Sequence, residues 1–266
     1  MLATAGTGHP GWRRRPLHAV VNATAFVKDD GTMDLAGLAH AAGLALRAMD
    51  NAMLLAGTAS GPVRIGLIGL ADVLALAGES YGSARGRTRA TEIVRAMADG
   101  CLTANLQLAH ERGAGIHGSS HVAVERLRRR GVSGDIVGEV ERHGLRHADT
   151  MTLAPHPRLA LLANDVADAC DPLAPEHHTH PLLGAETACC DGYAFEHLRA
   201  LRADTSRTET LASLPPSAGI AMRAALRPWA DDLDTGLHRT AGRQVPAETC
   251  AGASWTPRNG RPNGNP

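Results

Sequence analysis

The stretch from Val63 to Ala77 constrains the fold of this chain more than any other part of its sequence. It opens with V-R-I-G-L-I, a short apolar run with β-branched residues that is typical of a buried strand. Gly66 and Gly69 interrupt this run, and Asp72 is followed by an apolar pattern that suits a helix. Because glycine tolerates a positive φ and a close backbone approach, the pattern predicts a strand, a tight turn and a helix.

Two interpretations of this glycine turn are open. Backbone N–H groups at the start of a helix can bind an anion such as a phosphate. A turn with the same G-x-x-G spacing can instead pack the strand and the helix closely together, and the bare motif does not distinguish the two. Of the two, packing is the simpler interpretation.

The composition excludes several classes of protein. Of the 266 residues, 44% are hydrophobic and only 3% are aromatic, so the core must be built from Ala, Leu, Val and Met. The 27 Lys and Arg residues balance 27 Asp and Glu residues, which removes any general attraction to nucleic acid or acidic membranes. No apolar run approaches the ~20 residues of a membrane span. Five irregularly spaced cysteines do not indicate a disulfide framework.

We therefore expect a reduced, cytoplasmic protein with no membrane and no nucleic-acid partner. The richness in Ala, Arg and Gly indicates a bacterial source of high GC content. One domain is expected over residues 16–235. Residues 1–15, which carry three consecutive arginines, are predicted to be a flexible basic arm. Residues 236–266 are rich in Gly, Pro and Asn and are predicted to be a disordered tail.

Hydrophobic periodicity predicts three helices in the first half of the domain. Asp34 is suited to cap a long helix whose apolar residues recur at three- and four-residue steps as far as Met53. A second long helix is expected over residues 88–112, and a short basic helix over residues 122–130. The arginines of the short helix could hold an anion or form a solvated face.

Four segments of the chain resemble, in the same order, the large catalytic subunit of ribonucleotide reductases. The glycine turn, V-R-I-G-L-I-G-L-A-D, is similar to the family's I-G-L-G-V-M-G-(F/L)-A-D, with Arg64 at the family's first glycine. Before it, N-A-T-A-F-V from Asn22 and M-D-N from Met49 stand where the family has C-N-L-G-S-I-N-L-x-x-F-V and L-D-N. After it, G-L-R-H-A from Gly144 resembles G-x-R-N-A, and M-R-A-A-L-R-P-W from Met222 resembles a family helix.

The resemblance implies an α/β fold that is rich in helix. The family barrel has ten strands in two parallel five-stranded halves, with a radical-bearing finger loop inside. By this resemblance the chain is a partial barrel, the C-terminal half that follows the loop, and is closest to the adenosylcobalamin-dependent class. The family reaction converts ribonucleotides to deoxyribonucleotides, and adenosylcobalamin is implied as a cofactor by the resemblance alone.

The segment after Ala154 departs from the family at its phosphate site. The family's P-T-(G/S)-T-I-S loop supplies backbone N–H and hydroxyl groups to substrate phosphates, whereas this chain has P-H-P-R-L-A. The second proline of this run removes one backbone donor. His156 and Arg158 could still meet a phosphate by charge. Together with Gly66 and Gly69 they are the candidate nucleotide-phosphate residues, in a site that differs from the family's.

The cysteines that the family's chemistry requires are missing from this sequence. The family places a thiyl radical on a cysteine in an N-x-C-x-E loop, and no such motif occurs here. The second redox cysteine would fall at Pro16, and Cys101 lies in a predicted helix as a core residue. We expect a pseudoenzyme-like protein without self-contained catalysis that binds a nucleotide or a partner. The alternative is a nucleotide or nucleoside enzyme that a second chain completes.

A histidine-rich segment supports a further alternative, a metal-dependent enzyme. His177, His178 and His180, with Cys170, could bind a metal. A zinc site needs about four convergent ligands, and the spacing of the remaining cysteines fits no zinc finger. A solvated loop is the competing interpretation.

A half barrel would leave strand edges and apolar inner faces uncovered. We therefore expect a homo-oligomer or a hetero-partner that covers the open half.

Overall fold

The computed structural model describes residues 17–57, 63–115, 121–180, 182, 189–206 and 208–231, with only the backbone described for 189 and 190. The predicted arm and tail, at residues 1–15 and 236–266, lie outside these ranges.

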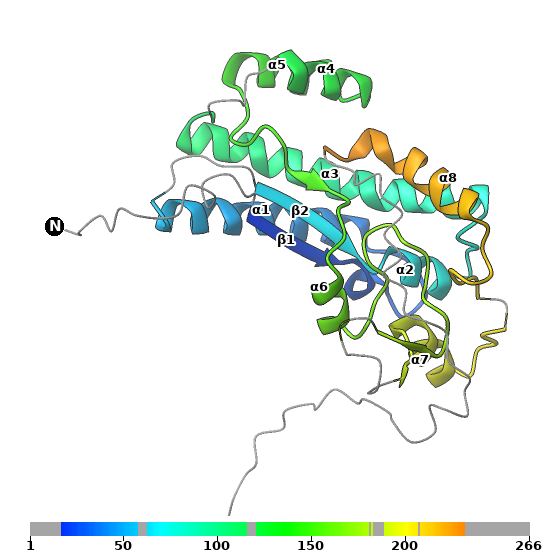
Figure 1. Cartoon of the computed structure of the whole chain (residues 1–266). Coiled ribbons are helices and arrows are strands. Elements are labelled where there is room, and N and C mark those ends of the chain that lie inside the picture. The colour runs from blue at the N-terminus through cyan, green and yellow to red at the C-terminus, as the bar shows by residue number, and fades with distance from the viewer. Residues whose placement is uncertain are drawn as a thin grey trace, which may run out of the picture.

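Three parallel strands form the central sheet in the order β1 (Leu17–Asn22), β2 (Val63–Ile68) and β3 (Met151–Thr152) (Figure 1). The register places Val20 of β1 beside Gly66 of β2, and Gly66 beside Thr152 of β3. Within the described residues the sheet is open rather than closed into a barrel. The α/β class is confirmed, and the described residues combine this three-stranded sheet with extensive helix.

Two long helices cover one face of this sheet, α1 (Leu35–Leu55) and α3 (Ala84–Arg112) (Figure 1). Asp34 caps α1 as predicted, because its Oδ1 accepts a hydrogen bond from Gly37 N at 2.9 Å. The two helix backbones come very close at Gly100, where a Cβ atom would lie 2.0 Å from the carbonyl oxygen of Ala39. Glycine is therefore required there for the packing of α1 against α3.

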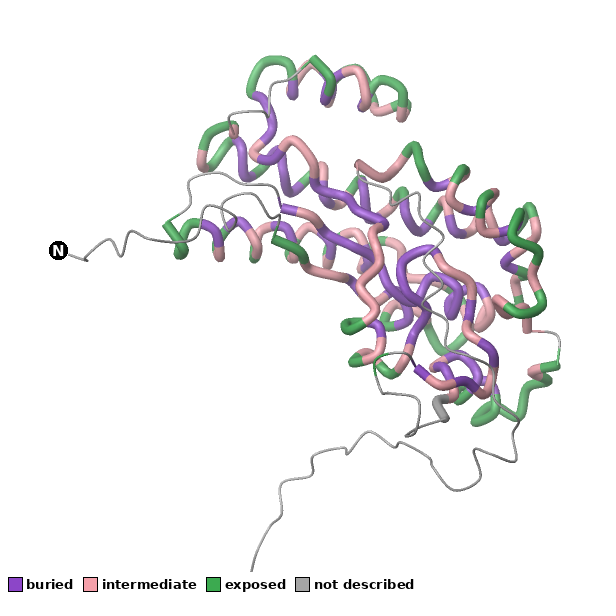
Figure 2. The backbone as a smooth tube through the Cα atoms, viewed as in Figure 1, coloured by how far each residue is buried: buried purple, intermediate pink, exposed green. Residues whose placement is uncertain are grey.

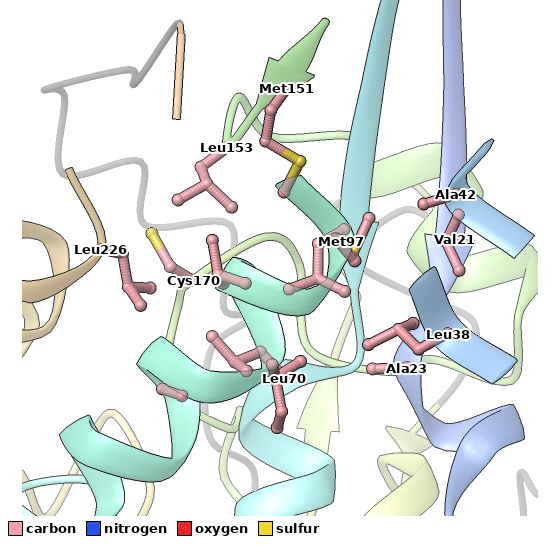
Figure 3. Packing of buried hydrophobic residues seen from close by; sticks show 14 of the residues in the cluster. Val21, Ala23, Leu38, Ala42, Leu70, Met97, Met151, Leu153, Cys170 and Leu226 are labelled. Carbon is pink, nitrogen blue, oxygen red and sulfur yellow. The ribbon is translucent and has the colours of Figure 1, made fainter. Parts of the chain in front are cut away.

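The main core lies between these helices and the sheet, and Figure 3 shows its packing. Successive side chains of a strand point to opposite faces. Val63, Ile65 and Leu67 of β2 all belong to this core and are fully buried. Ile68 instead packs with Ala160 in a separate small cluster, on the opposite face of the sheet. Figure 2 shows that β2 is buried along its length, whereas β1 begins exposed at the edge of the sheet.

The remaining helices surround this unit. Helices α4 (His121–Arg129) and α5 (Gly134–His143) pack on each other and on the end of α3. The elements around the carboxyl ends of the strands are η2 (Ala23–Phe26), α2 (Leu70–Leu76), α6 (Pro157–Leu162), β4 (His178–Thr179), β5 (Cys189–Cys190) and α7 (Tyr193–Ala200). Helix α8 (Pro216–Leu226) and the short helix η3 (Arg227–Trp229) that follows it pack against α3. No helix in the described part of the chain is both long and apolar enough to cross a membrane.

Two predicted boundaries differ from the structure. Helix α3 begins at Ala84, before the predicted start, because the Ser83 hydroxyl accepts from Gly86 N at 2.9 Å and caps the helix. The sequence from Gly144 to Pro155 predicts a buried strand that leads into a loop, and in the structure this strand has only the two residues of β3. The segment before β3 is held by side chains instead of a strand partner, since Asn105 exchanges two hydrogen bonds with the backbone of His147.

Candidate functional site

The carboxyl ends of the three parallel strands lie at one edge of the sheet and lead into η2, α2 and α6. In open α/β sheets this edge is where ligands usually bind. The four residues predicted to contact a phosphate lie on or near it.

The glycine turn at the end of β2 is a packing turn. Gly69 has φ 80°, and its N–H donates to Ala167 O at 2.7 Å, so this backbone donor is already used. A Cβ atom at Gly69 would lie 2.7 Å from Asn22 Oδ1 and 2.9 Å from Thr24 Cγ2. Both the backbone conformation and the space therefore require glycine, and the packing interpretation describes Gly69.

Asp72 fastens the helix after this turn to two distant segments. Its carboxylate is fully buried and accepts hydrogen bonds from Ala167 N at 2.6 Å and Ala194 N at 3.1 Å. Burial raises the pKa of Asp72 to about 7, although the two backbone hydrogen bonds act in the opposite direction. Asp72 therefore holds α2, the segment after α6 and the start of α7 together.

His156 lies over the open face of the sheet. Its backbone N–H donates to Asp168 Oδ1 at 2.7 Å, which fixes the loop between β3 and α6. Its ring covers Gly66 so closely that a Cβ atom there would lie 3.1 Å from the ring Nε2. The ring also meets His18 of β1 edge-on, with centroids 5.2 Å apart. The glycine at position 66 thus provides the space that the His156 ring occupies.

The His156 ring is placed to receive a polar group. Its Nε2 is buried and makes no hydrogen bond to the described residues. Burial and the neighbouring His18 lower the pKa of His156, so the ring is neutral at pH 7. The sequence analysis did not single out His18. Strand alternation would have placed His18 on the same face of β1 as Asn22.

The four candidate phosphate residues are thus divided by the structure. Gly66 and His156 are in contact, whereas Gly69 is occupied by the packing turn. Arg158 lies exposed on α6, two residues after His156. Arg64 stands beside His18 in the register of β1 and β2, on the same face as Gly66. This open face therefore gathers nitrogen donors that suit an anion.

Comparison with protein families identifies the fold. The family model described as the ribonucleotide reductase barrel domain matches residues 18–221. The chain belongs to this family. The match spans all three strands and the edge at which they end. No curated protein matches the chain.

The two thiols that the structure describes lie in the core of this barrel-domain chain, away from the open face of the sheet. Cys101 is fully buried in α3, as predicted, and burial raises its pKa to about 12. Cys170 packs with Leu153 and Leu226 in the same core (Figure 3), and burial raises its pKa to about 11. Neither is a thiolate at neutral pH.

The predicted metal cluster is separated in space. His177 Nδ1 lies 2.6 Å from Asp191 Oδ1, and Cys170 is buried in the core. His178 and His180 instead face Asp165, with their Nε2 atoms 3.0 and 3.8 Å from its carboxylate oxygens. Among the described residues, no group of three or more His, Cys, Asp or Glu side chains is arranged to hold a metal ion.

The arginines of the short basic helix are paired with acidic side chains. Arg126 and Arg130 both contact the carboxylate of Asp231, which is 4% exposed. Arg128 pairs with Glu141, and Arg129 with Glu125. Asp231 also accepts the backbone N–H groups of Thr150 and Met151, at 2.7 and 3.0 Å. The carboxylate of Asp231 therefore joins α4, through Arg126, and the start of β3 to the segment that follows η3.

Proposed function

We propose that this ribonucleotide reductase barrel-domain protein binds the phosphate of a nucleotide on the open face of its sheet and does not reduce ribonucleotides by itself. The observation that supports this most directly is the His156 ring, seated on Gly66 with a buried Nε2 that has no hydrogen-bond partner among the described residues. A phosphate oxygen is an acceptor, so this neutral ring would donate from Nε2 to it.

Charge on the same face supports an anionic ligand. Arg64 and His18 are cross-strand neighbours, and Arg158 stands exposed at the start of α6 beside His156. Guanidinium groups form strong, often bidentate, hydrogen bonds with phosphate. The phosphate would therefore lie between the sheet and α6, held by side chains in place of the backbone donors of the family loop.

The cysteines support the proposal that the chain does not reduce ribonucleotides by itself. The family's chemistry needs a cysteine that carries a radical at the substrate ribose, and the sequence contains no N-x-C-x-E motif. The described thiols, Cys101 and Cys170, are both core residues. The described residues therefore do not fit the radical chemistry of adenosylcobalamin-dependent relatives, and we derive no step through that cofactor.

A thermal melt against nucleotides tests the proposal. Ribonucleoside di- and triphosphates and deoxynucleotides would be compared with adenosylcobalamin and inorganic phosphate. A ligand at about one hundred times its Kd should add about 2.7 kcal/mol of stability to the native state. His156→Gln and Arg158→Gln should each reduce the shift, whereas Arg129→Gln on α4 should leave it unchanged.

Two results would overturn this proposal. A cooperative melt that no nucleotide moves would exclude the binding site. Turnover of a ribonucleotide by the purified chain, supplied with adenosylcobalamin and a dithiol reductant, would show that the chain is catalytically active by itself.

A second candidate function, assembly with another chain, is supported by the open sheet. In the described residues β1 has a neighbour on one side only, and the face that carries His18 is not covered by α1 or α3. A homo-oligomer or a hetero-partner would cover this edge, and a partner could complete a nucleotide or nucleoside enzyme. Light scattering on the purified chain would test self-assembly, and activity on co-expression would test completion. A clean monomer that gains no activity with any co-expressed chain would contradict it.

A further inference from the structure

A cavity of about 110 Å³ adjoins the proposed phosphate site and lies between α6, α7, α8 and the segment 165–174. Its walls are mostly apolar and include Val166, Leu173, Phe195 and Leu214. An apolar cavity of about 150 Å³ holds a molecule of the size of benzene, so this one is large enough for a compact ligand. The polar residues in its wall determine which kind of ligand it can bind.

The charged side chains of this cavity are predominantly acidic. Asp165, Asp168 and Asp171 line it together with a single arginine, Arg223. Arg223 is paired with Asp171, so its positive charge is already balanced. A cationic ligand is therefore favoured over an anionic one.

A specific gap between two hydrogen-bond acceptors occurs in this wall. His178, which is 1% exposed, has its Nδ1 2.9 Å from the carbonyl oxygen of Pro175. A carbonyl only accepts, so Nδ1 carries the proton and the neutral ring has its lone pair on Nε2. That Nε2 lies 3.0 Å from Asp165 Oδ2, a buried oxygen with no hydrogen-bond partner among the described residues. With the His178 ring neutral, two acceptors among the described residues face each other at the cavity wall without a donor between them.

His180 does not supply the missing donor. Its Nδ1 accepts the N–H of Leu182 at 3.2 Å, so the neutral ring carries its proton on Nε2. Burial lowers the pKa of His180, which favours this neutral form. Its Nε2 lies 3.8 Å from Asp165 Oδ1, beyond hydrogen-bond distance. The same proton prevents Nε2 of His180 from binding a metal, which argues against a metal ion shared with Asp165.

We propose that this cavity binds a small organic ammonium ion, whose N–H groups donate to Asp165 Oδ2 and His178 Nε2 and whose short apolar body packs against Phe195 and Leu214. An ammonium carries up to three donors and no acceptor, which matches the two acceptors that Asp165 and a neutral His178 ring offer. Its charge balances that of Asp165, and its apolar body displaces poorly held water from the apolar wall. The four side chains that would contact the ammonium ion are not among the residues proposed to bind the phosphate.

The test measures binding of n-butylammonium to the full-length protein at pH 8 by titration calorimetry, with n-butanol and butyrate as isosteric controls. Saturable one-to-one binding of the ammonium alone is expected. Asp165→Asn should weaken it about tenfold or more, because a charge-assisted hydrogen bond is lost. Asparagine tolerates the left-handed backbone at this position, where φ is 55°. Glu111→Gln, on the exposed side of α3, should have no effect.

A second variant keeps the proposal testable if Asp165→Asn fails to fold. Gly219 of α8 lines the cavity, so Gly219→Leu would fill it and should abolish binding while leaving Asp165 in place. Nitrogen NMR of the free protein at pH 8 should show His178 protonated on Nδ1 alone. A doubly protonated His178, equal binding of n-butanol, or no effect of either variant would each overturn the proposal. So would saturable Zn²⁺ binding at Asp165 with no response to the ammonium.

Discussion

The guanidinium of Arg146 meets the carboxylate of Asp50 with Nε 2.9 Å from Oδ1, in a part of the fold where both side chains are almost wholly buried. The two residues come from segments 96 positions apart, M-D-N and G-L-R-H-A, each of which resembles the reductase family. Arg112 and His147 contact the same carboxylate. The two motifs therefore meet as one buried ion-pair network that joins α1, α3 and the segment before β3.

Replacement of Asp50 should be strongly destabilising. Asp50→Asn leaves the buried guanidinium of Arg146 without its counter-charge, and breaking one side of a buried ion pair costs about 3–5 kcal/mol. The matched control is Glu111→Gln, which breaks the exposed pair with Arg47 and should cost less than about 1 kcal/mol. Urea unfolding monitored by circular dichroism measures both. Similar losses for the two variants would refute the structural role of the buried network.

The buried carboxyl of Asp72 should make stability depend on pH. Burial raises its pKa in the folded state to about 7, above the value near 4 of an unfolded chain. Between these values the folded protein holds a proton that the unfolded chain has lost. The contribution of Asp72 to stability therefore falls by about 1.4 kcal/mol per pH unit as the pH rises from about 4 to about 7. Urea midpoints at pH 5 and pH 7 should show this decline, and Asp72→Asn should remove it. A decline of the same size in the variant would mean that another group is responsible.

The glycine turn allows steric contact to be separated from backbone strain. Gly69→Ala places a methyl group 2.7 Å from Asn22 Oδ1 at a residue whose φ is 80°. Gly31 has nearly the same φ, 77°, but no atom within 4 Å of the added Cβ. Gly31→Ala should therefore cost about 1 kcal/mol from strain alone, and Gly69→Ala clearly more. Thermal unfolding of the two variants measures the difference. If both variants lose the same stability, the contact with Asn22 is unimportant.

The core thiols should be chemically inert in the folded protein. Burial raises the pKa of Cys101 to about 12 and that of Cys170 to about 11, so neither presents a thiolate to a reagent at pH 8. Iodoacetamide should leave both unmodified in the native state and modify both after unfolding in guanidinium chloride, as read by peptide mass spectrometry. Rapid native labelling of either would show that it is accessible, and would weaken the argument from thiols against catalysis.

Much of the scaffold followed from local patterns in the sequence. The strand, turn and helix from Val63, the cap at Asp34 and the core position of Cys101 were all predicted and are confirmed. Each depends on residues within one or two turns of one another, where spacing and propensity are enough. Helices α5, α6 and α7 were not predicted. The six residues of α6 are too few to show a helical period.

The candidate sites were decided by tertiary structure. The sequence placed His156 near a phosphate site, but only the folded structure brings the ring of His18 edge-on against it. It also grouped His178 with Cys170, whereas folding turns that histidine toward Asp165 and sends the thiol into the core.

The pairing of the α4 arginines with Asp231 likewise joins residues about one hundred positions apart. The sequence by itself indicated the family and the α/β class, because the motifs and periodicities behind both are local runs of residues. Which polar groups meet, and which remain without a donor or an acceptor, depended on side chains that only the packing of distant segments brings within hydrogen-bond distance.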